Sequence, residues 1–83
     1  MDNTIHASAF EKIFESKYGW IGRRSAGLYE SFYLIVQDQR AVSGAIAVRI
    51  SKEAAERIIT SGGDAKLIDA AARNLQNGYL FVK

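Results

Sequence analysis

Hydrophobic and polar positions change their period twice in the second half of this 83-residue chain, and the changes divide it into elements. Residues 45–50, Ala-Ile-Ala-Val-Arg-Ile, alternate strictly, which predicts a half-buried strand. From residue 52 to residue 61 the apolar positions recur with the period of a helix. Ser51 stands at the N-cap position of this helix, where its hydroxyl can accept a backbone N–H of the first turn. Two charge pairs at i,i+4 spacing support the helix: Lys52–Glu56 and Glu53–Arg57.

Two adjacent glycines separate this helix from a second one. Gly62 and Gly63 end the first helix, because glycine adopts the left-handed conformation of a helix C-terminus without a Cβ clash. Asp64 caps a second helix over residues 65–76, and residues 79–82 form a closing strand. The stretch from Ser61 to Lys66 also looks superficially like a phosphate-binding loop. It lacks the required glycine and lysine spacing, so we interpret it as a joint between helices.

An apolar stripe with helical spacing predicts a third helix near the N-terminus. The stripe consists of Phe10, Ile13, Phe14 and Tyr18. Either Asn3 or Thr4 caps this helix, or Ser8 caps it together with Glu11 in a capping box. We expect the stripe to pack in the core, as large apolar side chains usually do.

The middle of the chain predicts a loop followed by two antiparallel strands. Segment 17–27 contains three glycines among nine consecutive residues and is predicted to be a loop. Residues 28–37 form the first strand, and residues 41–50 return as the second, with a turn at 38–40 and a bulge at Gly44. One face of the first strand is apolar: Leu28, Phe32, Leu34 and Val36.

These elements predict a single α+β domain spanning residues 1–83, in the order helix–strand–strand–helix–helix–strand. The sheet is three-stranded and mainly antiparallel, and the two C-terminal helices cover the face that carries Ile46, Val48 and Ile50. The other face, around Tyr33 and the alanines of the second strand, is smooth and partly apolar. We expect the N-terminal helix, a second copy of the chain or a target to cover it. The alternative position for the N-terminal helix is an edge of the sheet.

Composition narrows the class of protein. The chain has 11 basic and 9 acidic residues, a net charge of +2 and no cysteine. The charge is a mild bias, compatible with nucleic acid but typical of many soluble proteins. The apolar runs are far too short to span a membrane, and the N-terminus does not resemble a signal peptide. We therefore expect a cytoplasmic protein without a membrane partner.

The residues that carry common catalytic chemistry are scarce. His6 is the only histidine, and with no cysteine the sequence predicts no metal site and no histidine-based nucleophile. The carboxylates on predicted solvent faces are Glu11, Glu15, Glu53, Glu56 and Asp69. Nothing pairs two of them in a cleft, so we expect no cofactor and no enzymatic activity.

The strongest candidate for a binding surface is the glycine-rich segment 17–27 and its neighbourhood. It combines the only tryptophan with adjacent arginines, a mixture enriched at protein-binding hot spots. The predicted partner-binding residues are Tyr18, Trp20, Arg23, Arg24 and Tyr33. The alternative is that Trp20 is buried under the sheet while the arginines face solvent. The first hypothesis is a small regulator or inhibitor that binds another protein, of the kind that phages and mobile elements carry.

The second hypothesis is nucleic-acid binding, and the third is a homodimer with a structural role. The basic residues available for nucleic acid are Lys17, Arg23, Arg24, Arg40 and Arg49. Residues 45–76 also resemble the strand–helix–helix order of ribbon-helix-helix repressors. In that family two chains pair their strands, and the outward side chains, here Ala45, Ala47 and Arg49, enter the major groove. The resemblance implies a dimeric transcriptional regulator.

Overall fold

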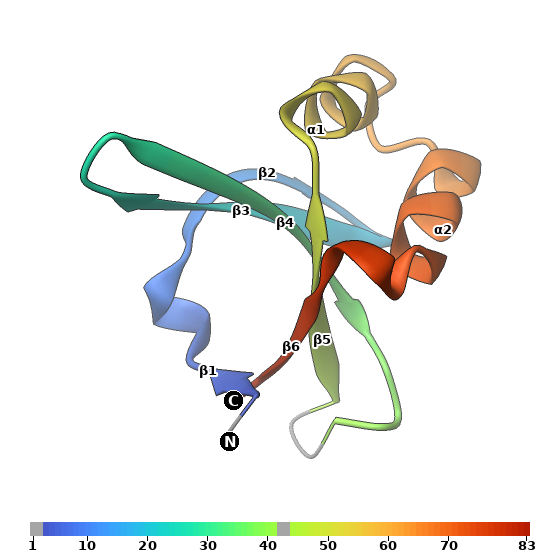
Figure 1. Ribbon diagram of the computed structural model, residues 1–83. Helices are drawn as coiled ribbons and strands as arrows, with labels where there is room; N and C mark the ends of the chain where they lie inside the picture. The colour runs from blue at the N-terminus through green and yellow to red at the C-terminus, as the bar shows by residue number, and fades with distance from the viewer. Residues whose placement is uncertain (1–2, 42–43) are drawn as a thin grey trace.

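A computed structural model describes residues 3–41 and 44–83 and shows a six-stranded sheet with two helices on one face (Figure 1). The sheet has the order β1-β6-β5-β4-β3-β2, and only the β1–β6 pair is parallel. In chain order the elements are β1 (Thr4–Ile5), the 3-10 turn η1 (Ala7–Ala9), β2 (Glu11–Ser16), β3 (Gly19–Ala26), β4 (Tyr29–Gln37), β5 (Ala45–Ile50), α1 (Lys52–Thr60), α2 (Ala65–Arg73), the 3-10 turn η2 (Leu75–Asn77) and β6 (Tyr79–Val82).

The predicted three-stranded sheet and the predicted order of elements are therefore wrong. The expected N-terminal helix is strand β2, and most of the expected loop 17–27 is strand β3. Gly44 lies in the connection before β5 and does not form a bulge in a strand. Residues 42 and 43, which belonged to the predicted second strand, lie outside the described residues.

The second half of the chain confirms its local predictions. Ser51 Oγ accepts the N–H of Ala54 at 3.0 Å and begins α1. Asp64 Oδ1 accepts the N–H groups of Lys66 and Leu67 at 2.8 and 3.1 Å and begins α2. The second helix ends at Arg73, three residues earlier than predicted, and η2 follows it.

The helices cover the face of the sheet that the alternation of β5 predicted, which we call the helix face. The buried cluster there contains Ile21, Leu34 and Ile50 from the sheet, with Ala55, Ile58 and Ile68 from the helices. Close packing between the helix connection and β2 explains why position 63, between the helices, requires glycine. A Cβ at Gly63 would lie 2.6 Å from Cβ of Ser16, and its φ is +89°.

A bulge explains why β2 resembles a helix in sequence. The β2–β3 register shifts between Lys12 and Phe14. As a result, Ile13 and Phe14 both pack against the helix-face cluster, although they are consecutive in the chain. Phe10 packs on the opposite side of the sheet, so three residues with helical spacing do not share one face.

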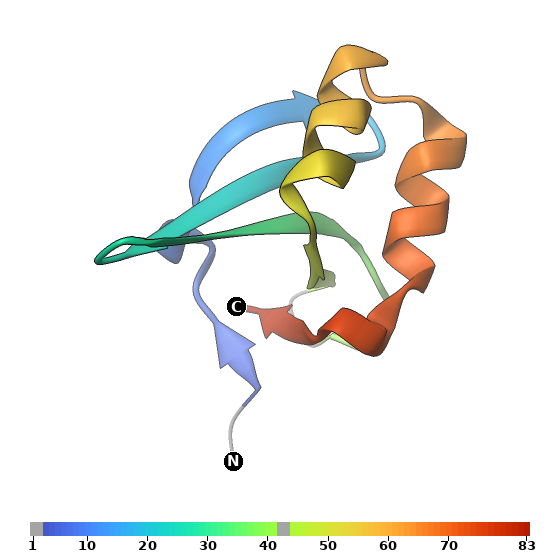
Figure 2. The same cartoon turned by 45° about the horizontal axis from the view of Figure 1, so that its top comes forward.

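The other side of the sheet, which we call the inner face, is covered by the chain's own N-terminal segment. That segment runs from β1 through η1 to β2, across the open side of the curled sheet (Figure 2). Phe10, which is 8% exposed, packs in a cluster with Tyr33, Ile35 and Ala47, and Ile5 packs against it. The cover predicted for this face is present, but it is an extended segment with a 3-10 turn and no α-helix.

Strands β3 and β4 extend beyond their neighbours and form an arm. Strand β2 reaches only Arg23, which pairs with Glu11, and β5 ends at Ile50, which pairs with Phe32. Residues 24–31 therefore form a two-stranded ribbon with no strand on either side, and it projects from the body in Figures 1 and 2.

The arm ends in a tight turn. Ala26 pairs with Tyr29, so only Gly27 and Leu28 form the connection. Gly27 has a φ of +63° and Leu28 has no positive φ, a pattern that matches a type II′ turn. Such a turn fits the twist of the flanking strands and holds the tip in one geometry.

Candidate functional site

The tip of the arm carries the two most exposed large apolar side chains among the described residues. Leu28 is 100% exposed and Tyr29 is 80% exposed, whereas Tyr18 is 47% exposed. The prediction that Leu28 shares a buried face with Phe32 is wrong for Leu28, because the arm extends past the end of β5. The neighbouring large side chains at the tip thus remain available for contact with another molecule.

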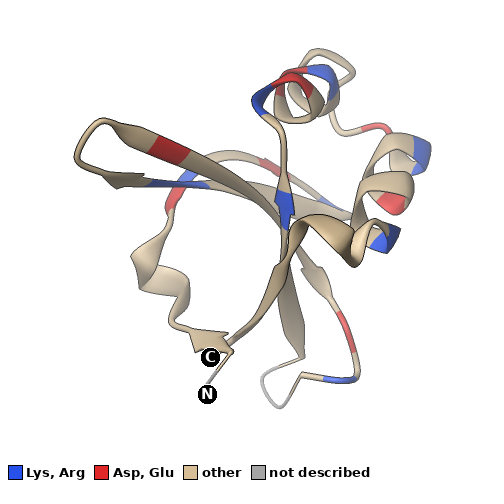
Figure 3. Cartoon of the chain, in the orientation of Figure 1, with Lys and Arg blue, Asp and Glu red and all other residues tan. Residues whose placement is uncertain are grey.

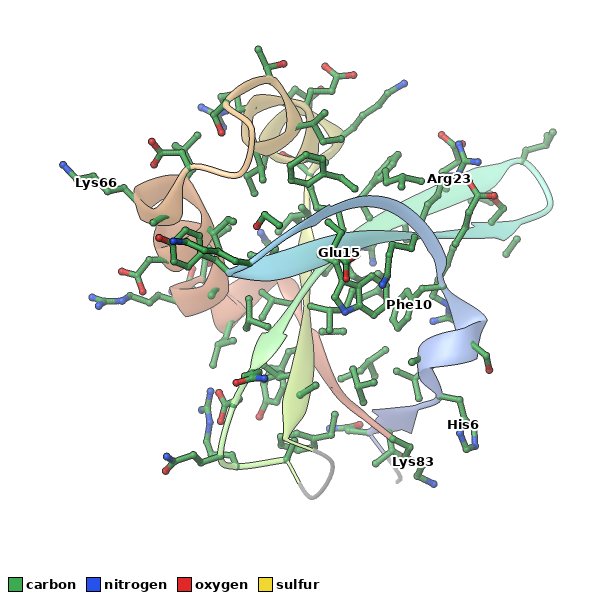
Figure 4. All side chains as sticks on the ribbon, turned by 180° about the vertical axis from the view of Figure 1, so that it is seen from behind. His6, Phe10, Glu15, Arg23, Lys66 and Lys83 are labelled. Carbon is green, nitrogen blue, oxygen red and sulfur yellow. The ribbon has the colours of Figure 1, made fainter. Side chains whose placement is uncertain are left out.

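The two adjacent arginines of β3, Arg23 at the base of the arm and Arg24 within it, differ in their partners. Arg23 forms ion pairs with Glu11 and, at 3.5 Å, with Glu30. Figure 4 shows Arg23 at the base of the projecting hairpin. Arg24 is exposed and forms no ion pair with any residue in the described ranges. Arg23 thus braces the arm, while Arg24 keeps its charge available.

Two of the predicted partner-binding aromatics belong to the inner-face cluster. Phe10 contacts Trp20 and Tyr33 edge to face, with ring centroids 5.9 and 5.3 Å apart. Tyr33 is only 8% exposed, and Trp20 is half-buried with Lys12 Nζ 5.0 Å from its ring centroid. Both side chains therefore contribute mainly to packing.

The remaining predicted aromatic lies away from the arm. Tyr18 is in the turn between β2 and β3, where Lys17 Nζ lies 5.0 Å from its ring centroid. This turn and Arg24 are at opposite ends of β3. The structure consequently does not bring the five predicted partner-binding residues together into one surface.

A groove lies between the arm and the start of α1. It has a volume of about 580 Å³, and its walls combine apolar and basic side chains. Tyr29, Phe32 and Ile50 contribute apolar surface, while Arg49 and Lys52 contribute charge. A smaller hollow of about 170 Å³ adjoins it, shares Arg49 and is also lined by Arg57.

The basic side chains around the groove have no acidic partners. Arg49, Lys52 and Arg57 form no ion pair within residues 3–41 and 44–83. Neither predicted i,i+4 pair of α1 forms, whereas Asp69 and Arg73 of α2 are 3.2 Å apart. Figure 3 shows basic residues at the end of β5 and the start of α1.

The other predicted nucleic-acid contacts are dispersed. Arg40 donates from its guanidinium to Asp38 at 2.6 and 3.0 Å, and its backbone N–H donates to the same carboxylate at 2.8 Å. The side-chain hydrogen bond from Arg40 chiefly lowers the pKa of Asp38 to about 2, and it raises the pKa of Arg40. This pair and Lys17 lie at the end of the sheet where β3 begins, away from Arg24 and Arg49.

The side chains considered for catalysis lie at the surface. His6 is exposed in the N-terminal segment (Figure 4), and the five carboxylates predicted on solvent faces are exposed. Within the described part of the chain, no group of three or more metal-ligating side chains comes together, and no polar side chain is buried.

No family model, curated protein or solved structure matches this chain. The resemblance to ribbon-helix-helix repressors also meets an obstacle in the sheet. Strand β5 lies between β4 and β6, so neither of its edges is open to a strand from a second chain. Ala47, one of the outward positions in that family, is fully buried.

Neither helix, at nine residues each, is long enough to cross a membrane. The described residues contain no other helix that is long and apolar enough to do so.

The sequence hypotheses named Arg24 of the arm and Arg49 of the groove as binding residues. They did not name Leu28 and Tyr29 at the tip, or Lys52 and Arg57 beside the groove. Leu28 and Tyr29 could have been found from the Gly27-Leu28 dipeptide, since a glycine followed by another residue between two alternating runs indicates a two-residue hairpin. Arg57 had no comparable pattern, because its expected partner on α1 appeared to neutralise it.

Proposed function

We propose that this protein is a non-enzymatic binding module that captures a partner protein through the β3–β4 arm. The observation that supports this most directly is the exposure of Leu28 and Tyr29 at the tip. Burying a side chain of this size stabilises a complex by about 1.5–3 kcal/mol. Tyrosine and arginine are enriched at the centres of binding sites, and Arg24 lies on the same arm.

The geometry of the arm also favours tight association. Its turn type fits the strand twist, and the ion pair between Arg23 and Glu30 links its two strands across one face. A partner would therefore meet side chains that are already positioned, and less conformational entropy would be lost on binding. This mode of action suits a small regulator or inhibitor that acts by covering a surface of another protein.

Nucleic-acid binding is less favoured because the basic residues expected to mediate it are dispersed. Arg23 and Arg40 are engaged with carboxylates, and Lys17 lies at the far end of β3 from Arg24. A nucleic-acid complex would weaken steeply with salt, by about 0.7–0.9 in log K per phosphate contact for each unit of log salt concentration. Salt dependence therefore separates the two hypotheses.

The test is affinity capture from a lysate of the source organism, with and without nuclease. We expect a discrete protein to be captured by the natural chain and lost with the double variant Leu28→Ala/Tyr29→Ala. Ile59→Ala is the matched control, since Ile59 is an exposed apolar residue on α1, outside the arm. The melting temperature of the double variant should agree closely with that of the natural chain, because Leu28 and Tyr29 are 100% and 80% exposed and substitutions of exposed side chains change stability by about 0.5 kcal/mol or less.

Capture that persists in the double variant would refute this surface as the binding site. Capture that disappears after nuclease treatment would refute protein recognition and support nucleic acid.

A further inference from the structure

The hydrogen-bonding pattern leaves the backbone groups of Glu30 without a strand partner on the β5 side of the arm. The N–H of Arg49 donates to the carbonyl of Gly78 at 2.9 Å, so the backbone groups of Arg49 face the β6 side. Because these groups alternate sides along an antiparallel strand, those of Ile50 face β4, where Ile50 pairs with Phe32. Two residues earlier on β4, the N–H and C=O of Glu30 point to that same side.

None of the six described strands lies opposite Glu30 on this side. The chain leaves the sheet at Ser51 and enters α1, and the arm continues without a neighbour. The open edge borders the 580 Å³ groove whose apolar wall includes Phe32 and Ile50. An open strand edge is a template for an added strand, and peptide-binding domains use such edges for recognition.

The basic residues around this edge indicate which charge an added strand would carry. Arg49 and Lys52 line the groove, and Arg57 lines the hollow beside it. Among the described residues that line the groove, Glu30 is the one carboxylate, and it lies 3.5 Å from Arg23. The three basic residues have no acidic partner among the described residues, so the groove presents an excess of positive charge to solvent.

We infer that the partner contributes an extended acidic segment, which pairs with the backbone of Glu30 and places carboxylates beside Arg49, Lys52 and Arg57. This inference rests on the proposed function and specifies how the partner is held. A second copy of the chain is a poorer occupant, because a symmetric pairing would bring these basic residues against their own counterparts.

The first experiment selects binders from a displayed library of random twelve-residue peptides on the immobilised protein. We expect the enriched peptides to be rich in Asp and Glu alternating with apolar residues. The charge-reversed variant Arg49→Glu/Lys52→Glu should bind them at least tenfold more weakly. Lys66→Glu, an exposed reversal on α2, is the matched control and should bind as the natural chain does.

The second readout is amide hydrogen exchange by NMR, with the most enriched peptide as the probe. We expect exchange of the Glu30 amide to slow at least tenfold when the peptide binds. Ser25 is an internal control, because Arg24 pairs toward β4 and the N–H of Ser25 therefore points to the opposite edge, beyond the end of β2. Its exchange should not change.

The outcomes separate this inference from the proposed function. Peptides that depend on Leu28 and Tyr29 but tolerate Arg49→Glu/Lys52→Glu would refute the acidic segment and leave the arm as the binding surface. Slowed exchange at Ser25 with none at Glu30 would refute the added strand. Peptides insensitive to both sets of substitutions, or no enrichment over an unrelated protein, would count against both proposals.

Discussion

The substitution Phe10→Ala tests whether the N-terminal segment covers and stabilises the inner face of the sheet. Phe10 follows η1 directly and is 8% exposed. Its ring contacts Trp20 and Tyr33 edge to face, and it leaves no room for a side chain at Gly22, where a Cβ would lie 2.7 Å from Cβ of Phe10. Removing the ring empties the centre of the inner-face cluster.

The expected loss of stability is large for a domain of this size. Replacing a buried phenylalanine by alanine costs about 3–5 kcal/mol, which includes about 0.5–1.5 kcal/mol for each aromatic pair. Native domains are stable by only about 5–15 kcal/mol. A small domain loses about 4–8 °C in melting temperature per kcal/mol, so Phe10→Ala should lower it by at least about 12 °C.

The measurement is urea unfolding followed by far-UV circular dichroism, together with a thermal melt. Tryptophan fluorescence is unsuitable as the main probe, because Phe10 touches Trp20 directly. Leu28→Ala is the control, since that side chain is fully exposed and its loss should change the free energy of unfolding by about 0.5 kcal/mol or less. A loss below about 1 kcal/mol in Phe10→Ala would show that this segment does not cover the inner face.

Two further outcomes follow from local geometry. Gly63→Ala should destabilise the protein by about 2 kcal/mol or more in urea unfolding, because it adds a clash with Ser16 to an unfavourable φ. Gly62→Ala is the control and should cost about 1 kcal/mol, because Gly62 has a φ of +74° but open space around it. Equal losses of stability in the two variants would contradict the close packing at Gly63. The pKa of Asp38 is depressed to about 2, so its stabilising contribution is complete above about pH 4 and is lost as the pH falls toward 2. In an NMR titration, Arg40→Ala should return this pKa toward the ordinary value, and an unchanged pKa would contradict the assigned cause.

The helices and strands of residues 45–82 could be predicted because the interactions that begin and end them are local in sequence. Ser51 and Asp64 each accept N–H groups of the helix that follows, and the glycines between the helices adopt positive φ. Such caps act within a few residues of the chain, so a sequence displays them without any knowledge of the fold.

The first 27 residues could not be predicted because their structure depends on distant packing. The bulge in β2 places Ile13 and Phe14 on the same face of the sheet. Together with Phe10, which lies on the other face, they have the sequence spacing of an apolar helix stripe. Gly22 looked like a loop residue, but it is a strand glycine over which Phe10 packs. Position 22 requires glycine because Phe10 packs against it, and this contact forms only when the N-terminal segment lies on the curled sheet.

The candidate site was predicted only in part, for a related reason. Adjacent arginines and nearby aromatics drew attention to β3, which forms one strand of the arm, but Trp20 and Tyr33 pack in the inner-face cluster. The exposure of Leu28 depends on where β5 ends, and the sequence of β4 does not contain that information.

The place of β6 in the sheet has a consequence for synthesis. Residues 51–78 separate β5 from β6, yet β6 lies between β5 and β1, and both of these strands leave the ribosome before β6 does. At about 5–20 residues per second, β1 and β5 wait for seconds before the strand that joins them is made. Until then Ala45–Ile50 presents an uncovered apolar edge, so a nascent chain that pauses after β5 is exposed to aggregation at that strand.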